Sequence, residues 1–71
     1  MPAVVSSVIG RVHYQPAARI LEVTFKQGRR YSYFGVPMRE YRALLRAPSK
    51  GAFYPARIRD RYPYWRRPAP G

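Results

Sequence analysis

Few side chains in this sequence could do acid–base or metal chemistry. The 71 residues include three acids, Glu22, Glu40 and Asp60, a single histidine, His13, and no cysteine. Glu22 and Glu40 fall in different predicted elements, and Asp60 stands between two arginines as a salt-bridge partner. Because carboxylates, thiols and histidines are not clustered, we expect no catalytic residues, no metal site and no cofactor. His13 is expected to be an ordinary surface residue.

Positive charge dominates the composition. Lysine and arginine number 14 against 3 acids, so the formal net charge is +11. Only Lys26 and Lys50 are lysines; the other bases are arginines, whose planar guanidinium suits both phosphate binding and stacking on rings. Residues 46–71 carry seven bases and a single acid. A charge of this size attracts polyanions, so the sequence predicts a nucleic-acid partner.

The candidate contacts to nucleic acid are of two kinds. The predicted phosphate contacts are Arg39, Arg42, Arg46, Lys50, Arg57, Arg59 and Arg61. The predicted base-stacking residues are Tyr54, Tyr64 and Trp65, followed by Tyr31 and Tyr33. Two alternatives stay open. Tyr31 and Tyr33 could be core residues with their hydroxyls at the rim, and Trp65 could fold back to cap the small core.

Alternating apolar residues predict the strands. In the first strand, Val8, Val12 and Tyr14 share the buried face, while Ile9, Arg11 and His13 face outward. In the second, Leu21, Val23 and Phe25 share one face. A hairpin then leads to the third strand, which carries the two tyrosines.

The length of this hairpin loop decides which face the tyrosines take. A two-residue turn pairs Phe25 with Arg30 and puts the tyrosines opposite the apolar face. A three-residue loop, Lys26-Gln27-Gly28, puts glycine in the left-handed position and pairs Phe25 with Arg29, Val23 with Tyr31 and Leu21 with Tyr33. We prefer the three-residue loop, because it leaves the other face nearly all polar, as a one-sided antiparallel sheet requires.

Two short helices are predicted after the strands. Pro37 starts the first, which carries Met38, Tyr41, Leu44 and Leu45 on one side and ends at Ala47-Pro48. Pro55 is expected to interrupt any helix begun at Lys50 and to open the second helix, Pro55 to Tyr62. Residues 68–71 are expected to form a frayed Pro-rich tail, so residues 1–67 make a single domain. The predicted fold is α+β, a three-stranded antiparallel meander covered on one face by two short helices, in the order β-β-β-α-α.

Five segments of the chain, in order, match a known family pattern: SSVIGRVHY, LEVTF, YSYFGVP, APSKGAFY and IRDRYPY. Together they span roughly Ser6 to Arg67 and resemble the KTSC domain, a short bacterial domain found alone and at the C-terminus of some lysyl-tRNA synthetases. The family's central Tyr-x-Tyr falls on Tyr31 and Tyr33, and its Ile-Arg on Ile58 and Arg59. Its Val-Pro falls on Val36 and Pro37, and its small-residue loop on Ser49, Lys50 and Gly51. Pro55 departs from the pattern, where asparagine is expected. Through the synthetase attachment, the resemblance implies an RNA ligand.

The predicted function is a small, non-catalytic nucleic-acid-binding domain that prefers RNA over DNA. The first alternative is a protein-interaction module with an acidic partner, and the enzymatic alternative is a nuclease or phosphotransferase that uses Asp60 or Ser49. No apolar run is long enough to span a membrane, and the N-terminus lacks a secretory signal pattern, so a cytoplasmic location is expected. An open strand edge leaves the oligomeric state undecided.

Overall fold

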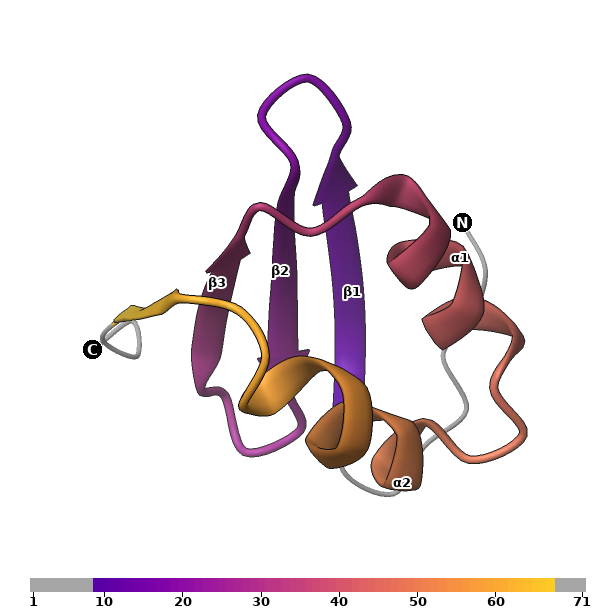
Figure 1. Ribbon diagram of the computed structural model, residues 1–71. Coiled ribbons are helices and arrows are strands. Elements are labelled where there is room, and N and C mark those ends of the chain that lie inside the picture. Colours follow the sequence, from indigo (N-terminus) through magenta and orange to yellow (C-terminus); the bar gives the residue numbers. More distant parts are fainter. Residues whose placement is uncertain (1–8, 68–71) are drawn as a thin grey trace.

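The computed structural model of the chain describes residues 9–67, which form one antiparallel sheet with helices on one face (Figure 1). The elements in chain order are β1 (Ile9–Gln15), β2 (Ile20–Phe25), β3 (Arg30–Phe34), α1 (Met38–Arg46), α2 (Lys50–Tyr54), η1 (Pro55–Arg59) and β4 (Tyr64–Arg67). The strands lie in the order β1-β2-β3-β4. The α+β class is confirmed, but the predicted three-stranded sheet is wrong, because the described residues form four strands.

The fourth strand is built from residues that the sequence placed just before a frayed tail. After η1 the chain returns to the open edge of β3, where Tyr64 pairs with Tyr33 and Trp65 with Ser32. The amide of Phe34 donates to the carbonyl of Pro63 at 2.9 Å and begins this pairing. An unpaired strand edge offers free N–H and C=O groups to any segment that reaches it. The return path therefore creates β4, although its own sequence lacks the alternation of a strand. The predicted tail, residues 68–71, lies outside the described residues.

The hairpin between β2 and β3 has the predicted three-residue loop. The amide of Phe25 donates to the carbonyl of Arg29 at 2.9 Å, and Gly28 takes a φ of +99°. The register pairs Val23 with Tyr31 and Leu21 with Tyr33, as expected. Both tyrosines consequently lie on the same face as the apolar side chains of β2.

One residue of β1 points the opposite way from its predicted side. The alternation placed Ile9 outward, but Ile9 is fully buried in the core. The register between β1 and β2 shifts between Ile9 and Arg11, so a bulge at Gly10 breaks the period of two. Val12 is buried as predicted, while Val8 lies outside the described residues.

Helix α1 packs against the core through most of the apolar side that the sequence predicts. Leu44 is fully buried, and Tyr41 and Leu45 are partly buried against the core. The prediction is wrong for Met38, which is exposed, while Glu40 is buried in its place. Pro37 stands just before the helix as its N-cap, and Ala47 ends it, as expected before Pro48.

The second helical segment differs from the prediction. Helix α2 begins at Lys50, where the hydroxyl of Ser49 accepts a hydrogen bond from the amide of Ala52, and the chain stays helical through Pro55. Residues Pro55–Arg59 form a π-helical turn. Proline lacks the N–H of a helical bond, and its ring would crowd the preceding turn of a regular helix. The wider π turn accommodates it, so Pro55 changes the pitch without ending the helix.

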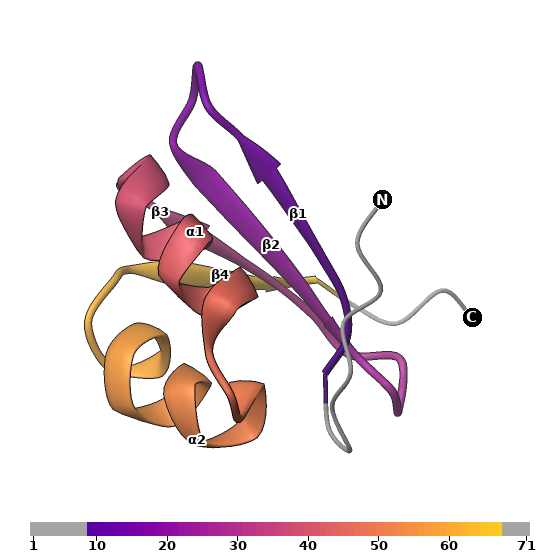
Figure 2. The ribbon, with the colours of Figure 1, turned by 90° about the vertical axis from the view of Figure 1, so that its right-hand side faces the viewer.

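The helices cover only one side of the sheet. Figure 2, turned by 90°, shows α1, α2 and η1 on one side, with no described helix on the other. The core between the layers consists of Ile9, Val12, Leu21, Val23, Phe25, Tyr33, Val36, Leu44, Tyr54 and Ile58. Within residues 9–67, no helix is long and apolar enough to cross a membrane.

Candidate functional site

A cleft lies between the β2–β3 hairpin and the α2–η1 segment, and we call it the tyrosine cleft. Its volume is about 280 Å³, and it is lined by Phe25, Gln27, Arg29, Tyr31, Gly51, Tyr54, Pro55 and Arg59. Three predicted site residues thus come together at one place, because Tyr31 on β3 lies beside Tyr54 and Arg59 of the α2–η1 segment. The cleft combines ring surface with two guanidinium groups, which is the chemistry of a site for an aromatic or anionic group.

Two tyrosine hydroxyls meet beside this cleft. The hydroxyls of Tyr33 and Tyr54 hydrogen-bond to each other, and both residues are buried. Burial raises the pKa of Tyr33 far above its ordinary value, and the hydrogen bond that its hydroxyl shares with Tyr54 adds to the effect. Burial also raises the pKa of Tyr54, although its bond to Tyr33 acts in the opposite direction. The pair is therefore a neutral core contact. The prediction that Tyr33 and Tyr54 stack bases is wrong, because their rings already pack within the protein.

The remaining aromatic candidates have more open rings. Tyr31 is half-buried, meets Phe25 edge-on at a centroid distance of 5.5 Å, and lies 5.6 Å from the ring of Tyr64. Tyr64 is exposed, so Tyr31 and Tyr64 form the accessible part of the ring cluster. Trp65 is also exposed but follows Tyr64 on β4, so its side chain lies on the opposite face of the sheet.

The cations of the cleft are Arg59 and Arg29. Arg59 lies 3.7 Å from the carboxylate of Asp60, as expected for that acid, but both side chains are more than half exposed. An exposed pair of this kind is weak, so the guanidinium of Arg59 is available to a ligand. Sequence reasoning missed Arg29. Its signal was its position directly after the left-handed Gly28, where a three-residue loop fixes the residue at the end of the hairpin.

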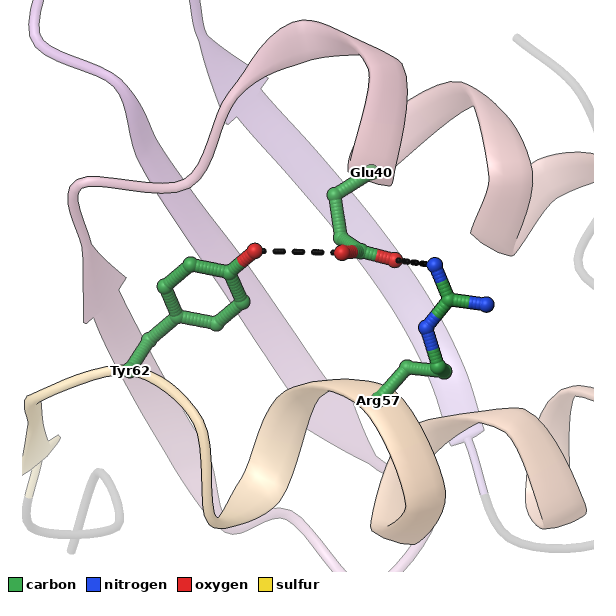
Figure 3. A network of polar contacts seen from close by, with 3 residues as sticks. All are labelled: Glu40, Arg57 and Tyr62. Carbon is green, nitrogen blue, oxygen red and sulfur yellow. Dashed lines mark hydrogen bonds and ion pairs between the residues drawn. The ribbon is translucent and has the colours of Figure 1, made fainter.

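Arg57 has a partner inside the protein, shown in Figure 3. Its guanidinium lies 3.2 Å from Oε2 of Glu40, and the hydroxyl of Tyr62 donates to Oε1 of Glu40 at 3.1 Å. The ion pair lacks hydrogen-bond alignment, so Oε2 has no hydrogen-bond donor among the described residues. Burial and the bond to Glu40 raise the pKa of the Tyr62 hydroxyl. The charge of Arg57 thus compensates a buried carboxylate that joins α1 to η1, while half of its side chain stays exposed.

The other predicted phosphate contacts lie outside the cleft. Arg39, Arg42 and Arg46 are exposed on α1, and Arg61 is exposed after η1. The ammonium group of Lys50 donates to the carbonyl of Ala47 at 3.1 Å and so closes the turn between the two helices. These residues form a basic helical surface rather than one enclosed site.

Each of the three acids already has partners. Glu40 and Asp60 pair with Arg57 and Arg59, and Glu22 accepts a hydrogen bond from Gln15 at 2.8 Å and lies 3.8 Å from Arg67. Three of the 14 bases are thus in ion pairs, which leaves eleven without an acidic partner among residues 9–67. Within that range, no group of three or more His, Asp or Glu side chains could hold a metal ion.

This chain is similar in sequence and in fold to proteins of one family. The family model of the KTSC domain matches residues 5–62. The crystal structure of a KTSC domain protein from Yersinia pestis superimposes with a TM-score of 0.88 at 33% identity, covering 94% of each chain. An uncharacterized protein of Stutzerimonas stutzeri is 38% identical over 65 residues, which is 90% of this chain and 92% of the relative. A protein of Tsukamurella paurometabola is 37% identical over 62 residues, or 87% of this chain and 92% of the relative.

Proposed function

Since this chain belongs to the KTSC domain family, we propose that it is a small non-catalytic nucleic-acid-binding domain that prefers RNA. The observation that carries the proposal is the uncompensated charge: eleven bases have no acidic partner among residues 9–67, while each acid is paired. Such a surface repels itself unless a polyanion neutralises it. A phosphate backbone supplies the needed charge at regular spacing.

The proposal assigns different roles to the two kinds of basic residue. Exposed arginines such as Arg39, Arg42 and Arg46 contact phosphates and give affinity with little sequence preference. Arg29 and Arg59 line the tyrosine cleft together with the ring of Tyr31, so this cleft accepts a phosphate or an unpaired base. Stacking on exposed rings requires bases that are not already paired, which favours RNA loops and single strands over duplex DNA.

The test is a titration of the protein into labelled single-stranded RNA, tRNA and duplex DNA, read by fluorescence anisotropy at low and moderate salt. We expect saturable RNA binding that is tighter than duplex binding and persists at moderate salt. For the single strand, log K should fall with log[salt] by about 0.7 per phosphate contact. Replacing Arg59 and Arg61 by alanine should lower RNA affinity and reduce the magnitude of this slope by about 0.7 or more, the equivalent of at least one phosphate contact. The unfolding temperature should be nearly unchanged.

Equally weak binding to all three nucleic acids that vanishes at moderate salt would refute the RNA proposal. The net positive charge would then explain only nonspecific attraction to polyanions. A protein partner that survives nuclease treatment of a pull-down and binds with defined stoichiometry would support the alternative of an acidic protein ligand. Release of labelled fragments from RNA in magnesium buffer, above a blank, would contradict the non-catalytic assignment.

A further inference from the structure

The face of the sheet that the helices leave open carries a defined arrangement of side chains. Strand register places Arg11, Thr24, Arg30 and Arg67 in one row across the four strands. His13, Glu22, Ser32 and Trp65 form the next row, and Gln15, Ile20 and Phe34 form a third. We call this surface the outer sheet face. None of the described helices covers it (Figure 2).

Two large rings are exposed at one end of the outer sheet face. Trp65 is 54% exposed and Phe34 is 38% exposed. Tyr33, the residue before Phe34 on β3, points to the helix side of the sheet and is buried. Trp65 pairs with Ser32, two residues before Phe34 on β3, so the two rings are diagonal neighbours on one face. Within residues 9–67 the two rings lie outside the hydrophobic core, and exposed ring surface of this kind is typical of a binding surface.

The other end of the same face is basic. The row of Arg11, Arg30 and Arg67 spans three strand spacings of about 4.8 Å, or roughly 14 Å. Among the described residues, Arg11 and Arg30 have no acidic partner. Arg67 has only a 3.8 Å contact with Glu22, and its guanidinium lies 5.7 Å from the centre of the Trp65 ring. This arginine therefore connects the basic row to the aromatic pair.

From this arrangement we propose that the outer sheet face binds single-stranded nucleic acid, with bases stacked on Phe34 and Trp65 and phosphates on Arg11, Arg30 and Arg67. The inference rests on the proposed function and locates its base-binding surface. Charge complementarity selects the occupant, because Glu22 is the only acid on the face and its carboxylate is already paired. A duplex hides the faces of its bases, so these two rings can be used only by unpaired nucleotides.

The basic row also continues toward the tyrosine cleft. Arg30 begins β3 on the outer face, and the preceding residue, Arg29, lines the cleft on the helix side. The two consecutive arginines thus lie on either side of the sheet at the hairpin end. A single strand that leaves the outer sheet face at Arg30 therefore meets Arg29 as the next cation on the way to the tyrosine cleft.

The experiment compares charge-matched and shape-matched variants in titrations with a labelled single-stranded RNA and with the same sequence as a duplex. Replacing Phe34 and Trp65 together by leucine keeps apolar bulk but removes the rings, and we expect about a tenfold or greater loss of single-strand affinity. Arg11→Gln with Arg30→Gln should reduce the salt slope by about 0.7 for each lost contact. The matched control, Arg19→Gln with Arg66→Gln, removes the same charge from an exposed loop position and from the opposite face of β4. It should lower affinity less than threefold.

A second readout follows the ring directly. Trp65 is the single tryptophan, so its fluorescence should be quenched at saturation by single-stranded RNA and shielded from iodide in the wild-type protein. Thermal unfolding of every variant shows whether it is folded at the temperature of the titration.

The outcomes separate the two proposals. If the wild type binds no RNA in a saturable way, the proposed function fails. If it binds, but the leucine variant binds as well as wild type and Trp65 fluorescence does not change, the outer sheet face is refuted while the function stands. If the leucine variant keeps RNA affinity but loses a nuclease-resistant protein partner, the face is a protein interface and the inference is overturned.

Discussion

The ion pair of Arg57 and Glu40 gives a specific stability prediction, because a half-exposed arginine compensates the charge of a buried carboxylate. The side chain of Glu40 is 8% exposed and that of Arg57 is 50% exposed. Replacing Arg57 by alanine leaves the carboxylate buried, with the hydroxyl of Tyr62 as its remaining donor among the described side chains (Figure 3). We expect Arg57→Ala to destabilise the fold.

The size of the effect follows from the geometry. Breaking a fully buried ion pair costs about 3–5 kcal/mol, because an uncompensated charge stays buried. Here water screens half of the arginine, and the 3.2 Å contact lacks hydrogen-bond alignment, so we expect about 1–2 kcal/mol. The variant also loses the contact of the Arg57 guanidinium with the Phe53 ring, whose centroid is 5.3 Å away, and the expected cost includes this loss. For a domain of this size, the change lowers Tm by roughly 4–16 °C.

The assay is thermal and urea unfolding followed by circular dichroism, with Arg61→Ala as the matched control. Arg61 is exposed and has no acidic partner among residues 9–67, so its loss should change stability by no more than about 0.5 kcal/mol. Adding Glu40→Gln to Arg57→Ala should recover part of the loss, because the neutral amide needs no counter-charge. Equal Tm values for the Arg57 and Arg61 variants, or no coupling between Glu40 and Arg57, would refute the reasoning.

Two further predictions concern the tyrosines and glycines. Because the pKa of Tyr33 is raised by burial and by Tyr54, the stability that its neutral form contributes is complete below pH about 10 and declines as the pH rises above that value, where the unfolded chain ionises first. Tyr33→Phe should make urea unfolding less sensitive to pH in that range, and an unchanged decline would assign it to other groups. Gly28→Ala should destabilise by about 1–2 kcal/mol because of its φ of +99°, whereas Gly51→Ala, in a helix with open space around it, should stabilise by roughly 0.4–1 kcal/mol. Melting curves of the two variants that shift in the same direction would contradict this assignment.

Local patterns in the sequence were sufficient for the β2–β3 hairpin and for the ends of helix α1. The alternation of Leu21, Val23 and Phe25 and the glycine at position 28 together favour the three-residue loop, because a two-residue turn would put the tyrosines on the opposite face. The same patterns failed where one residue breaks the period. The bulge at Gly10 buries Ile9, and the π turn at Pro55 lets a helix pass through a proline. Neither irregularity has a signal in hydrophobic spacing alone.

For the candidate sites too, some features follow from the sequence and others only from the tertiary structure. Composition determines the charge of +11, and with it the prediction of a polyanionic ligand, because charge is a sum over residues and needs no fold. Only the tertiary structure decides which side chains are free. It buries Tyr33 and Tyr54, pairs Arg57 with Glu40, and brings Arg29 to Arg59 across the cleft. It also adds β4 to the edge of β3, which places Trp65 beside Phe34. These contacts join residues far apart in the chain, and their strength depends on burial and distance, which a local pattern does not contain.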